Sequence, residues 1–366
     1  MFESEPPSAN REGAAVAVPV ALPELPGEPL VSVLMASYNY GQYLEQALES
    51  VRRQTYRSIE VIVCDDGSTD DSCEMVERVG RRDARIRLIR KANGGVASAL
   101  NAAYGASRGD VLCLLDADDL FMPEKVEAVV DHLRRLPEVG FVTHAMQVID
   151  GTGDPLHEIP FVRRVETGWI APAVRKRGGR WRNQPASALS FRREVARHLF
   201  PLPERELRRE ADGYLFTLAP LLTHVSFIDR VLSAYRLHGS NLTGTDRIDL
   251  SSTLRQLDAR ERVVGAAGVR LRALGLPELD IERHLGYLEA GLTRSLLEGR
   301  PLPELVRQAR VMGAALLADD LYGLPRKLLG VLAYGGASLL PRARRAAWLT
   351  TILGLKPPSR RSPASR

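Results

Sequence analysis

Short apolar runs alternate with helical periodicity along the first half of the chain. Four apolar runs typical of buried strands lie at 31–36, 59–64, 86–91 and 111–115. Between them, apolar residues recur at helical spacing, as in Leu44, Leu48 and Val51 on one predicted helix face. Because strand and helix alternate at short range, we predict right-handed crossovers and a mostly parallel central sheet flanked by helices.

The pattern becomes less regular after a helix predicted at 123–136. A longer β segment, VGFVTHAMQVID, is followed at 160–186 by an Arg-, Gly- and Pro-rich stretch. This stretch predicts a loop, in which Trp169 and Trp181 are either structural anchors or sugar-stacking residues. The elements predicted next are a short strand and helix, a helix at 211–222, and two short strands that end in Arg236 and His238.

The last third of the chain has Leu, Val and Ala at helical spacing with charges between them. Helices are predicted at about 250–264, 277–298, 302–317 and 324–340. Together they form a C-terminal helical region at 246–355. Residues 1–29 and the basic tail at 356–366 have no such periodicity, so both ends are predicted to be disordered.

Charge is distributed unevenly along the 366 residues. The segment from Leu321 to Arg366 contains nine Lys or Arg and no Asp or Glu; since the whole chain carries +5, residues 1–320 carry −4. An acidic body argues against a nucleic-acid-binding face. The basic, partly apolar segment at 321–366 fits a helix on an anionic membrane surface, or a helical appendage packed on the core or on a second subunit of a homo-oligomer.

Cysteine usage and hydropathy bear on the cellular compartment. Cys64, Cys73 and Cys113 lack metal-binding spacing and are predicted to be reduced, as in a cytosolic protein. We expect neither a membrane-spanning helix, because no run of about 18 apolar residues occurs, nor a secretory signal. The prediction is a cytoplasmic protein, free or peripheral on the inner face of the membrane.

Acidic residues follow two of the predicted strands. Asp116, Asp118 and Asp119 come after the run at 111–115, and Asp65 and Asp66 end the run at 59–64. In open α/β sheets, ligands bind beyond the carboxyl ends of the strands. Two carboxylates 4 Å apart repel one another by about 4 kcal/mol at an effective dielectric of about 20, so we expect a cation, Mg2+ or Mn2+, between them. The alternative is that these acids form turns and helix N-caps.

Four segments in order carry a resemblance to a known family. They are VSVLMASYNYGQYLEQALESVRRQTY, EVIVCDDGSTDDS, RKANGGVASALNAAYGASRGDVLCLLDADD and YRLHGSNLT. This set, which spans residues 30–243, resembles the inverting glycosyltransferases of family 2, which have the GT-A fold with a Rossmann-like sheet. The resemblance implies a nucleotide-sugar-binding half at 30–125 and an acceptor-binding half at 126–245.

The resemblance also implies roles for residues at the strand ends. The turn with Ser37, Tyr38 and Asn39 would bind the nucleotide base together with Asp66, and Asp65 would support it. Lys91 or Asn93 would lie nearby, with a solvated Lys91 as the alternative. Asp116 would contact the ribose. Asp118 would bind the divalent ion on the diphosphate, His238 would ligate the same ion or contact the diphosphate, and Arg236 would offset phosphate charge.

The general base expected from the resemblance is Asp212, which would accept a proton from the acceptor hydroxyl. The segment ELRREADGYLF departs from the common adjacent Glu-Asp, because Ala211 precedes Asp212. Glu210 is therefore a second candidate, and a helix-capping role is the alternative for Asp212.

The implied activity is metal-assisted, non-processive transfer of a sugar from a nucleotide diphosphate. The carrier is UDP by family habit, with thymidine or guanosine diphosphate as the alternatives. Arg177 stands where processive synthases have the Gln of a Gln-x-x-Arg-Trp motif. The acceptor would be a carbohydrate or a lipid-linked glycan in cell-envelope or exopolysaccharide synthesis. Two other readings stay open, a sugar-nucleotide-binding protein that has lost turnover and a phosphatase-like hydrolase. The hydrolase motif is imperfect, because Asp119 and Leu120 follow the Asp pair.

Overall fold

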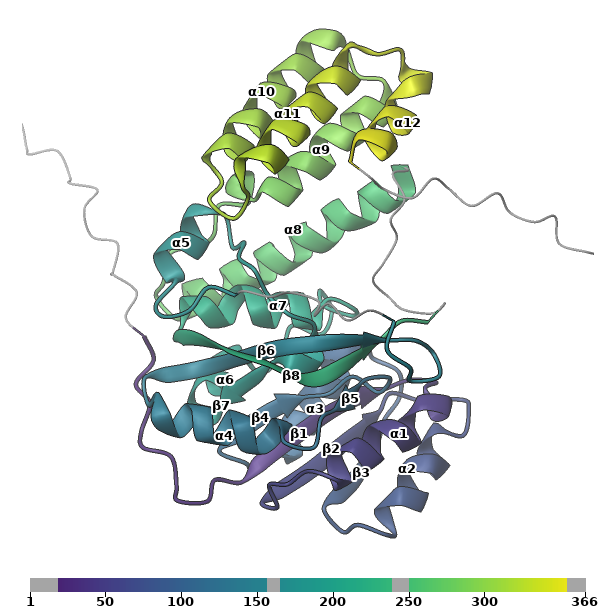
Figure 1. Cartoon of the computed structure of the whole chain (residues 1–366), viewed down its shortest axis with the longest axis vertical. Coiled ribbons are helices and arrows are strands. Elements are labelled where there is room, and N and C mark those ends of the chain that lie inside the picture. Colours follow the sequence, from purple (N-terminus) through teal and green to yellow (C-terminus); the bar gives the residue numbers. More distant parts are fainter. Residues whose placement is uncertain (1–18, 157–164, 239–249, 354–366) are drawn as a thin grey trace, which may run out of the picture.

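The computed structural model describes residues 19–156, 165–238 and 250–353, and Figure 1 shows a central sheet with helices on its faces and a group of helices at one end. The eight strands lie in the order β3-β2-β1-β4-β7-β6-β8-β5. They are β1 Val31–Ser37, β2 Ile59–Asp65, β3 Ile86–Arg90, β4 Val111–Leu114, β5 Leu120–Phe121, β6 Val139–Ile149, β7 Ser190–Arg192 and β8 His224–Arg236.

The first half of the sheet is parallel, as predicted. Strands β3, β2, β1 and β4 pair in parallel, and the register sets Ser37 opposite Asp65 at the carboxyl edge. Alternate residues of β1 point to opposite faces: Val33 packs in the cluster that contains the apolar residues of α1 and α2, and Leu34 packs in the cluster with α3. Both faces are therefore covered, which explains why these strands are apolar throughout.

Helices connect the strands and cover the sheet. In the first two thirds of the chain these are α1 Gly41–Arg52, α2 Ser72–Gly80, α3 Val96–Ala106, α4 Lys125–Arg135, α5 Ala171–Lys176, α6 Arg193–Leu199 and α7 Ala211–Leu218. Neither Asp118 nor Asp119 caps α4, because its N-cap residue is Glu124. The capping alternative for the acids after β4 therefore fails.

The second half of the sheet differs from the prediction at residues 224–236. These residues form one strand, β8, parallel to β6, instead of two short strands. The pairing shifts register between Ile228 and Val231, and the intervening Asp229 and Arg230 are exposed. A polar pair at a β-bulge thus resembles a turn in the sequence while the strand continues through it.

Trp181 is a structural anchor. It is 4% exposed, its indole N–H donates to the Phe216 carbonyl at 2.6 Å, and its ring meets Phe141 edge to face. The segment around it also contains helix α5, where a loop was predicted. A buried indole with its N–H satisfied within the protein is not available to stack on a sugar.

Helices dominate the C-terminal third, as predicted. They are α8 Leu250–Ala273, α9 Leu285–Glu298, α10 Leu302–Ala318, α11 Leu324–Leu339 and α12 Arg342–Ile352. Helix α8 packs Val263, Ala267 and Leu271 into the main core, whereas α9 to α12 surround a core of their own. The described helices include none with the length and apolar character needed to cross a bilayer.

Part of the N-terminal segment predicted to be disordered lies against the domain. The Val20 N–H donates to the Leu222 carbonyl at 2.7 Å, and Val20 and Leu22 pack on the main core. The ordered body therefore begins before Leu30. The remaining predictions for the two chain ends concern residues 1–18 and 354–366, which lie outside the described part.

Candidate functional site

The turn after β1 is bonded to the segment that follows the acidic end of β2. Asn39 has a left-handed backbone with φ of 58°, and its N–H donates to Ser68 Oγ at 2.8 Å. Its side-chain oxygen accepts the Thr69 N–H at 2.8 Å, and the Tyr40 N–H donates to Ser72 Oγ at 3.1 Å. These bonds fix the turn to the loop after β2, because an Asn side chain and a left-handed turn together satisfy the backbone groups on both sides.

Asp65 and Asp66 organise that loop. Asp65 Oδ1 accepts the N–H groups of Gly67 and Ser68, at 3.2 and 2.9 Å. Asp66 accepts the N–H groups of Gly94 and Gly95, at 2.9 and 2.7 Å, and pairs with Lys91 Nζ at 2.8 Å. Since a carboxylate has about four lone-pair directions, Asp66 retains room for about one more donor, such as a base N–H.

The remaining residues predicted to bind the nucleotide lie around this loop. Ser37 is buried at the end of β1, whereas Tyr38 is 45% exposed. Asn93 is exposed, and its side-chain oxygen accepts a hydrogen bond from Arg208 at 2.8 Å. Arg208 comes from the charged loop before α7, so it links that loop to the segment after β3. No local pattern predicts this contact.

The acidic segment after β4 is fixed by a serine and by β8. Ser187 Oγ accepts the Asp116 N–H at 3.0 Å and donates to Asp119 Oδ2 at 2.6 Å. The Arg236 N–H donates to Asp119 Oδ1 at 2.9 Å. Asp119 is 1% exposed. It therefore positions the segment, while Asp116 and Asp118 remain for ligand contacts.

The two predicted metal ligands lie next to each other. His238 Nε2 is 2.9 Å from Asp118 Oδ2, and the two side chains are 7% and 12% exposed. The Tyr43 ring stacks on His238 with centroids 4.8 Å apart, which fixes the imidazole plane. In the described ranges no group of three or more His, Cys, Asp or Glu side chains is arranged as a metal site, so Asp118 and His238 would supply two ligands.

The pKa shifts of Asp116 and Tyr40 show that these residues interact with the charge of Asp118. Burial raises the pKa of Asp116 well above its usual value, and the carboxylates of Asp119, Asp118 and Asp212 raise it further. The pKa of Tyr40 is raised by burial and then by Asp118 and Asp116. Negative charges from the segment after β4 and from the start of α7 thus meet at one edge of the sheet, where they favour a cation.

Asp212 and Glu210 differ in their surroundings. Asp212 lies in the first turn of α7, where Oδ1 accepts the Gly213 N–H at 2.8 Å. Burial raises its pKa, and the charge of Glu210 adds to the shift. Glu210 Oε1 is instead paired with Arg262 of α8 at 2.6 Å. Because the Glu210 carboxylate is already bonded to an arginine, the geometry favours Asp212 as the base.

Arg236 is placed differently from the predicted phosphate contact. Its side chain is fully buried, and its guanidinium donates to the Asp118 carbonyl at 2.7 Å, the Gly151 carbonyl at 3.1 Å and Gln46 Oε1 at 2.7 Å. It also lies over the Tyr43 ring, 5.1 Å from the centroid. These contacts argue against a phosphate ligand and assign Arg236 to positioning Asp118.

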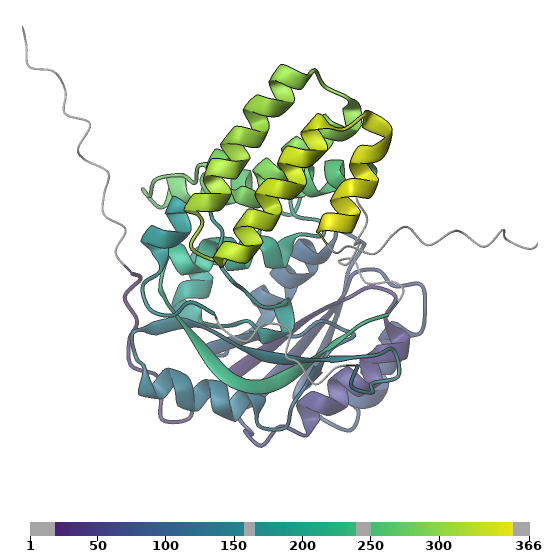
Figure 2. The same ribbon diagram turned by 45° about the horizontal axis from the view of Figure 1, so that its top comes forward.

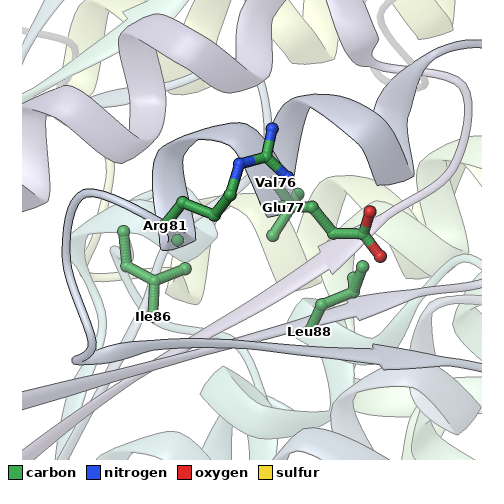
Figure 3. Close-up of a pocket in the computed structure, with 6 residues that line it drawn as sticks. Val76, Glu77, Arg81, Ile86 and Leu88 are labelled. Carbon is green, nitrogen blue, oxygen red and sulfur yellow. The ribbon is translucent and has the colours of Figure 1, made fainter.

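A surface hollow lies elsewhere on the domain. Figure 3 shows it between α2 and β3, where Val76, Glu77, Arg81, Ile86 and Leu88 line it. Ile86 is the first residue of β3, whereas the acidic residues follow the carboxyl ends of β2 and β4. The hollow is therefore not part of the acidic site.

Comparison with known proteins identifies the domain that carries these residues. Residues 32–200 match the family model described as glycosyl transferase family 2. An uncharacterized glycosyltransferase of Nostoc sp. is 33% identical over 212 residues, 58% of this chain and 66% of that protein. A chondroitin synthase of Pasteurella multocida is 39% identical over 99 residues, 27% of this chain and 10% of that protein. The matches thus span less than two thirds of either relative.

A solved structure extends the likeness to most of the fold. S. aureus TarS in complex with UDP-GlcNAc superposes with a TM-score of 0.53 at 16% identity, over 88% of this chain and 90% of that chain. At this identity the likeness concerns the fold alone, and it agrees with the eight-stranded, mostly parallel sheet and its C-terminal helices. Residues 32–200 therefore form a glycosyl transferase family 2 domain, and the chain has a GT-A-like fold.

Proposed function

We propose that the chain transfers a single sugar from a nucleotide-diphosphate donor to an acceptor hydroxyl, with inversion at the anomeric carbon. The observation that carries this proposal is the electrostatic coupling of Asp212 with Asp116, beside the adjacent Asp118 and His238. A proton acceptor and a diphosphate-binding centre on one sheet edge are what direct displacement requires.

The donor would lie across the ends of β1, β2 and β4. The turn at Ser37–Asn39 and Asp66 would bind the base, and Asp116 the ribose. Lys91, 2.8 Å from Asp66, would orient that carboxylate. TarS, whose fold this chain shares, was solved with UDP-GlcNAc, which favours a UDP-sugar donor.

Asp118 and His238 would bind Mg2+ or Mn2+ together with donor phosphate oxygens. Their donor set fits such an ion, because a carboxylate oxygen and an imidazole nitrogen already lie 2.9 Å apart in a nearly buried position. When bound, the ion neutralises charge that develops on the departing diphosphate. Arg236 and Ser187 act indirectly, since they fix the backbone around Asp118.

Asp212 would take the proton from the acceptor hydroxyl while that oxygen attacks the anomeric carbon. The new glycosidic bond forms on the face opposite the diphosphate, and the bond to the diphosphate oxygen breaks with its electron pair. Configuration therefore inverts in one displacement. The raised pKa of Asp212 makes it a stronger base than a solvated Asp.

The acceptor class is inferred from the relatives and from Arg177. The relatives include a chondroitin synthase, which favours a carbohydrate or lipid-linked glycan of the cell envelope or an exopolysaccharide. Arg177, where processive synthases have Gln, is buried and bonded to Glu166 and Asp320. This structural role is consistent with addition of one sugar and release.

A comparison of Asp212→Asn with Glu210→Gln tests the proposal. The readout is release of UDP from UDP-GlcNAc with Mn2+, water serving as acceptor, and NMR of the first sugar anomer formed. We expect the β anomer, a loss of about 10²-fold or more in rate for Asp212→Asn, and a change below about tenfold for Glu210→Gln. UDP affinity should stay within about twofold in both variants.

Three outcomes would contradict parts of this account. An Asp212→Asn protein with wild-type turnover would remove the base assignment. A wild-type protein that binds UDP without turning over any donor would be a sugar-nucleotide-binding protein. A covalent phosphoenzyme on Asp116 would instead indicate a phosphatase-like hydrolase.

A further inference from the structure

Helices α10, α11 and α12 expose an unusual set of side chains. Their exposed residues are Leu302, Pro303, Arg307, Arg310, Val311, Ala314, Leu317, Ala318, Leu324, Pro325, Arg326, Leu328, Leu329, Val331, Leu332, Leu339, Arg342, Ala343, Arg344, Ala347 and Thr351. None of them is acidic, and Thr351 is the one uncharged polar residue. Ordinary protein surfaces mix both signs of charge with neutral polar groups, so this composition calls for a partner.

The apolar part is concentrated on one side of α11. Leu324, Leu328, Leu332 and Leu339 are 63%, 55%, 56% and 74% exposed, and Val331 is exposed beside them. At about 100° per residue these five positions fall within about a third of the helix circumference. Ala333, Tyr334 and Ala337 on the opposite side are buried in the core of the helical region. Helix α11 is therefore apolar on both its inner and its outer side.

Arginine-bearing helices lie on each side of this stripe. Lys327 Nζ donates to the Leu317 carbonyl of α10 at 2.7 Å, and the Trp348 indole of α12 donates to the Ala333 carbonyl at 2.9 Å. Figure 2 shows the three helices, green to yellow, side by side at one end of the molecule. Arg307 and Arg310 are exposed on α10, and Arg344 is exposed on α12. The apolar stripe thus has positive charge on both flanks.

We propose that this face, defined as the exposed residues of α10 to α12 given above, binds the surface of an anionic phospholipid bilayer. The leucines of α11 would enter the boundary between headgroups and acyl chains, and the flanking arginines would pair with lipid phosphates. Charge complementarity favours lipid over a second copy of this chain, because two such faces would bring like charges together. From Leu321 to Arg366 the chain has nine Lys or Arg and no acid.

The arrangement also defines how the helices would lie. The exposed leucines extend from Leu324 to Leu339, the first and last residues of α11, and the arginines on the flanks need contact with headgroups or water. Helices α10 to α12 would therefore lie flat, with their axes in the plane of the membrane surface. This inference does not depend on the sugar transferred or on the acceptor, since it concerns a surface outside the acidic site.

Vesicle sedimentation of the full chain tests this inference. The vesicles would be pure phosphatidylcholine, or phosphatidylcholine with about a third phosphatidylglycerol, at low and high salt. The test variant is Leu328→Glu with Leu332→Glu. The matched control is Leu254→Glu with Val269→Glu, two exposed apolar positions of α8. A milder variant, Leu328→Ser with Leu332→Ser, and thermal melting of each protein separate lost binding from lost folding.

The wild type and the α8 control should bind the anionic vesicles and lose binding with added salt. The α11 Glu variant should bind them at least about tenfold more weakly, and the Ser variant should have intermediate affinity. Equal sedimentation by wild type and α11 variants, or no preference for anionic vesicles, would overturn the proposal. It would also be overturned if sedimentation velocity showed a wild-type oligomer that the α11 variants dissociate, because a second copy would then cover the face.

Discussion

Replacement of Arg236 distinguishes a positioning role from the phosphate contact predicted from the sequence. Arg236→Met keeps an unbranched chain of similar length and removes the guanidinium. The carbonyl oxygens of Asp118, Asp150 and Gly151 would lose donors now at 2.7, 3.3 and 3.1 Å, but only Asp118 is buried, since Asp150 is half-buried and Gly151 is exposed. Gln46 Oε1 would also lose its donor at 2.7 Å, but Gln46 is exposed and can bind water instead.

The size of the effect follows from these contacts. The buried Asp118 carbonyl left without a donor costs about 1–3 kcal/mol, whereas the more exposed Asp150 and Gly151 carbonyls can bind water instead. We expect a loss of about 1–3 kcal/mol in the free energy of unfolding. The loosened Asp118 segment should weaken cation-dependent UDP binding by about 10- to 100-fold, as is typical when a residue that orients a metal ligand is lost.

The assay is UDP titration by calorimetry with and without Mn2+, together with thermal melting. Arg78→Met is the matched control, because Arg78 is an exposed residue whose ion pair with Glu45 has an N–O distance of 3.4 Å; its effect should stay within about 1 kcal/mol. If Arg236→Met melts like the wild type and weakens UDP binding equally with and without Mn2+, Arg236 contacts phosphate directly and the positioning account is refuted.

Two further predictions concern the backbone near Asp66 and the base. Gly95 has φ of 93°, and an added Cβ would lie 2.7 Å from the Arg208 carbonyl oxygen. Gly95→Ala should therefore lower the free energy of unfolding, measured by denaturation, by about 2 kcal/mol or more. Gly105 lies in α3 with open space around it, so Gly105→Ala should raise that free energy by up to about 1 kcal/mol. Because Asp212 acts ionised and burial raises its pKa, the rate of UDP release should fall as pH decreases through a midpoint above the usual Asp value of about 4; a pH-independent rate down to that value would contradict this role.

The parallel half of the sheet could be predicted because its strands are buried on both faces. Residues such as Val33 and Leu34 pack on opposite layers, so the sequence shows an uninterrupted apolar run. The acids that follow these runs reach a common edge by topology alone. The pairing of Asp118 with His238, 120 positions away, was instead implied by the family resemblance.

Other features depend on contacts that no local pattern encodes. Arg236 resembles any cationic residue near a histidine until its burial is known, and Ser187 becomes important only because it lies against Asp116 and Asp119, about 70 positions away. The polar Asp229–Arg230 pair imitates a turn, although the bulge lets β8 continue. Sequence periodicity describes which face a residue occupies, but not which distant partner it meets.

Titration of UDP into wild-type and Asp118→Ala proteins, each with and without Mn2+, tests most directly the claim that a cation at Asp118 and His238 binds the donor diphosphate. We predict that Mn2+ raises the affinity of the wild type about tenfold or more and that Asp118→Ala loses this gain while its metal-free affinity stays within about twofold. An equal gain from Mn2+ in both proteins, or no gain in the wild type, would contradict the account.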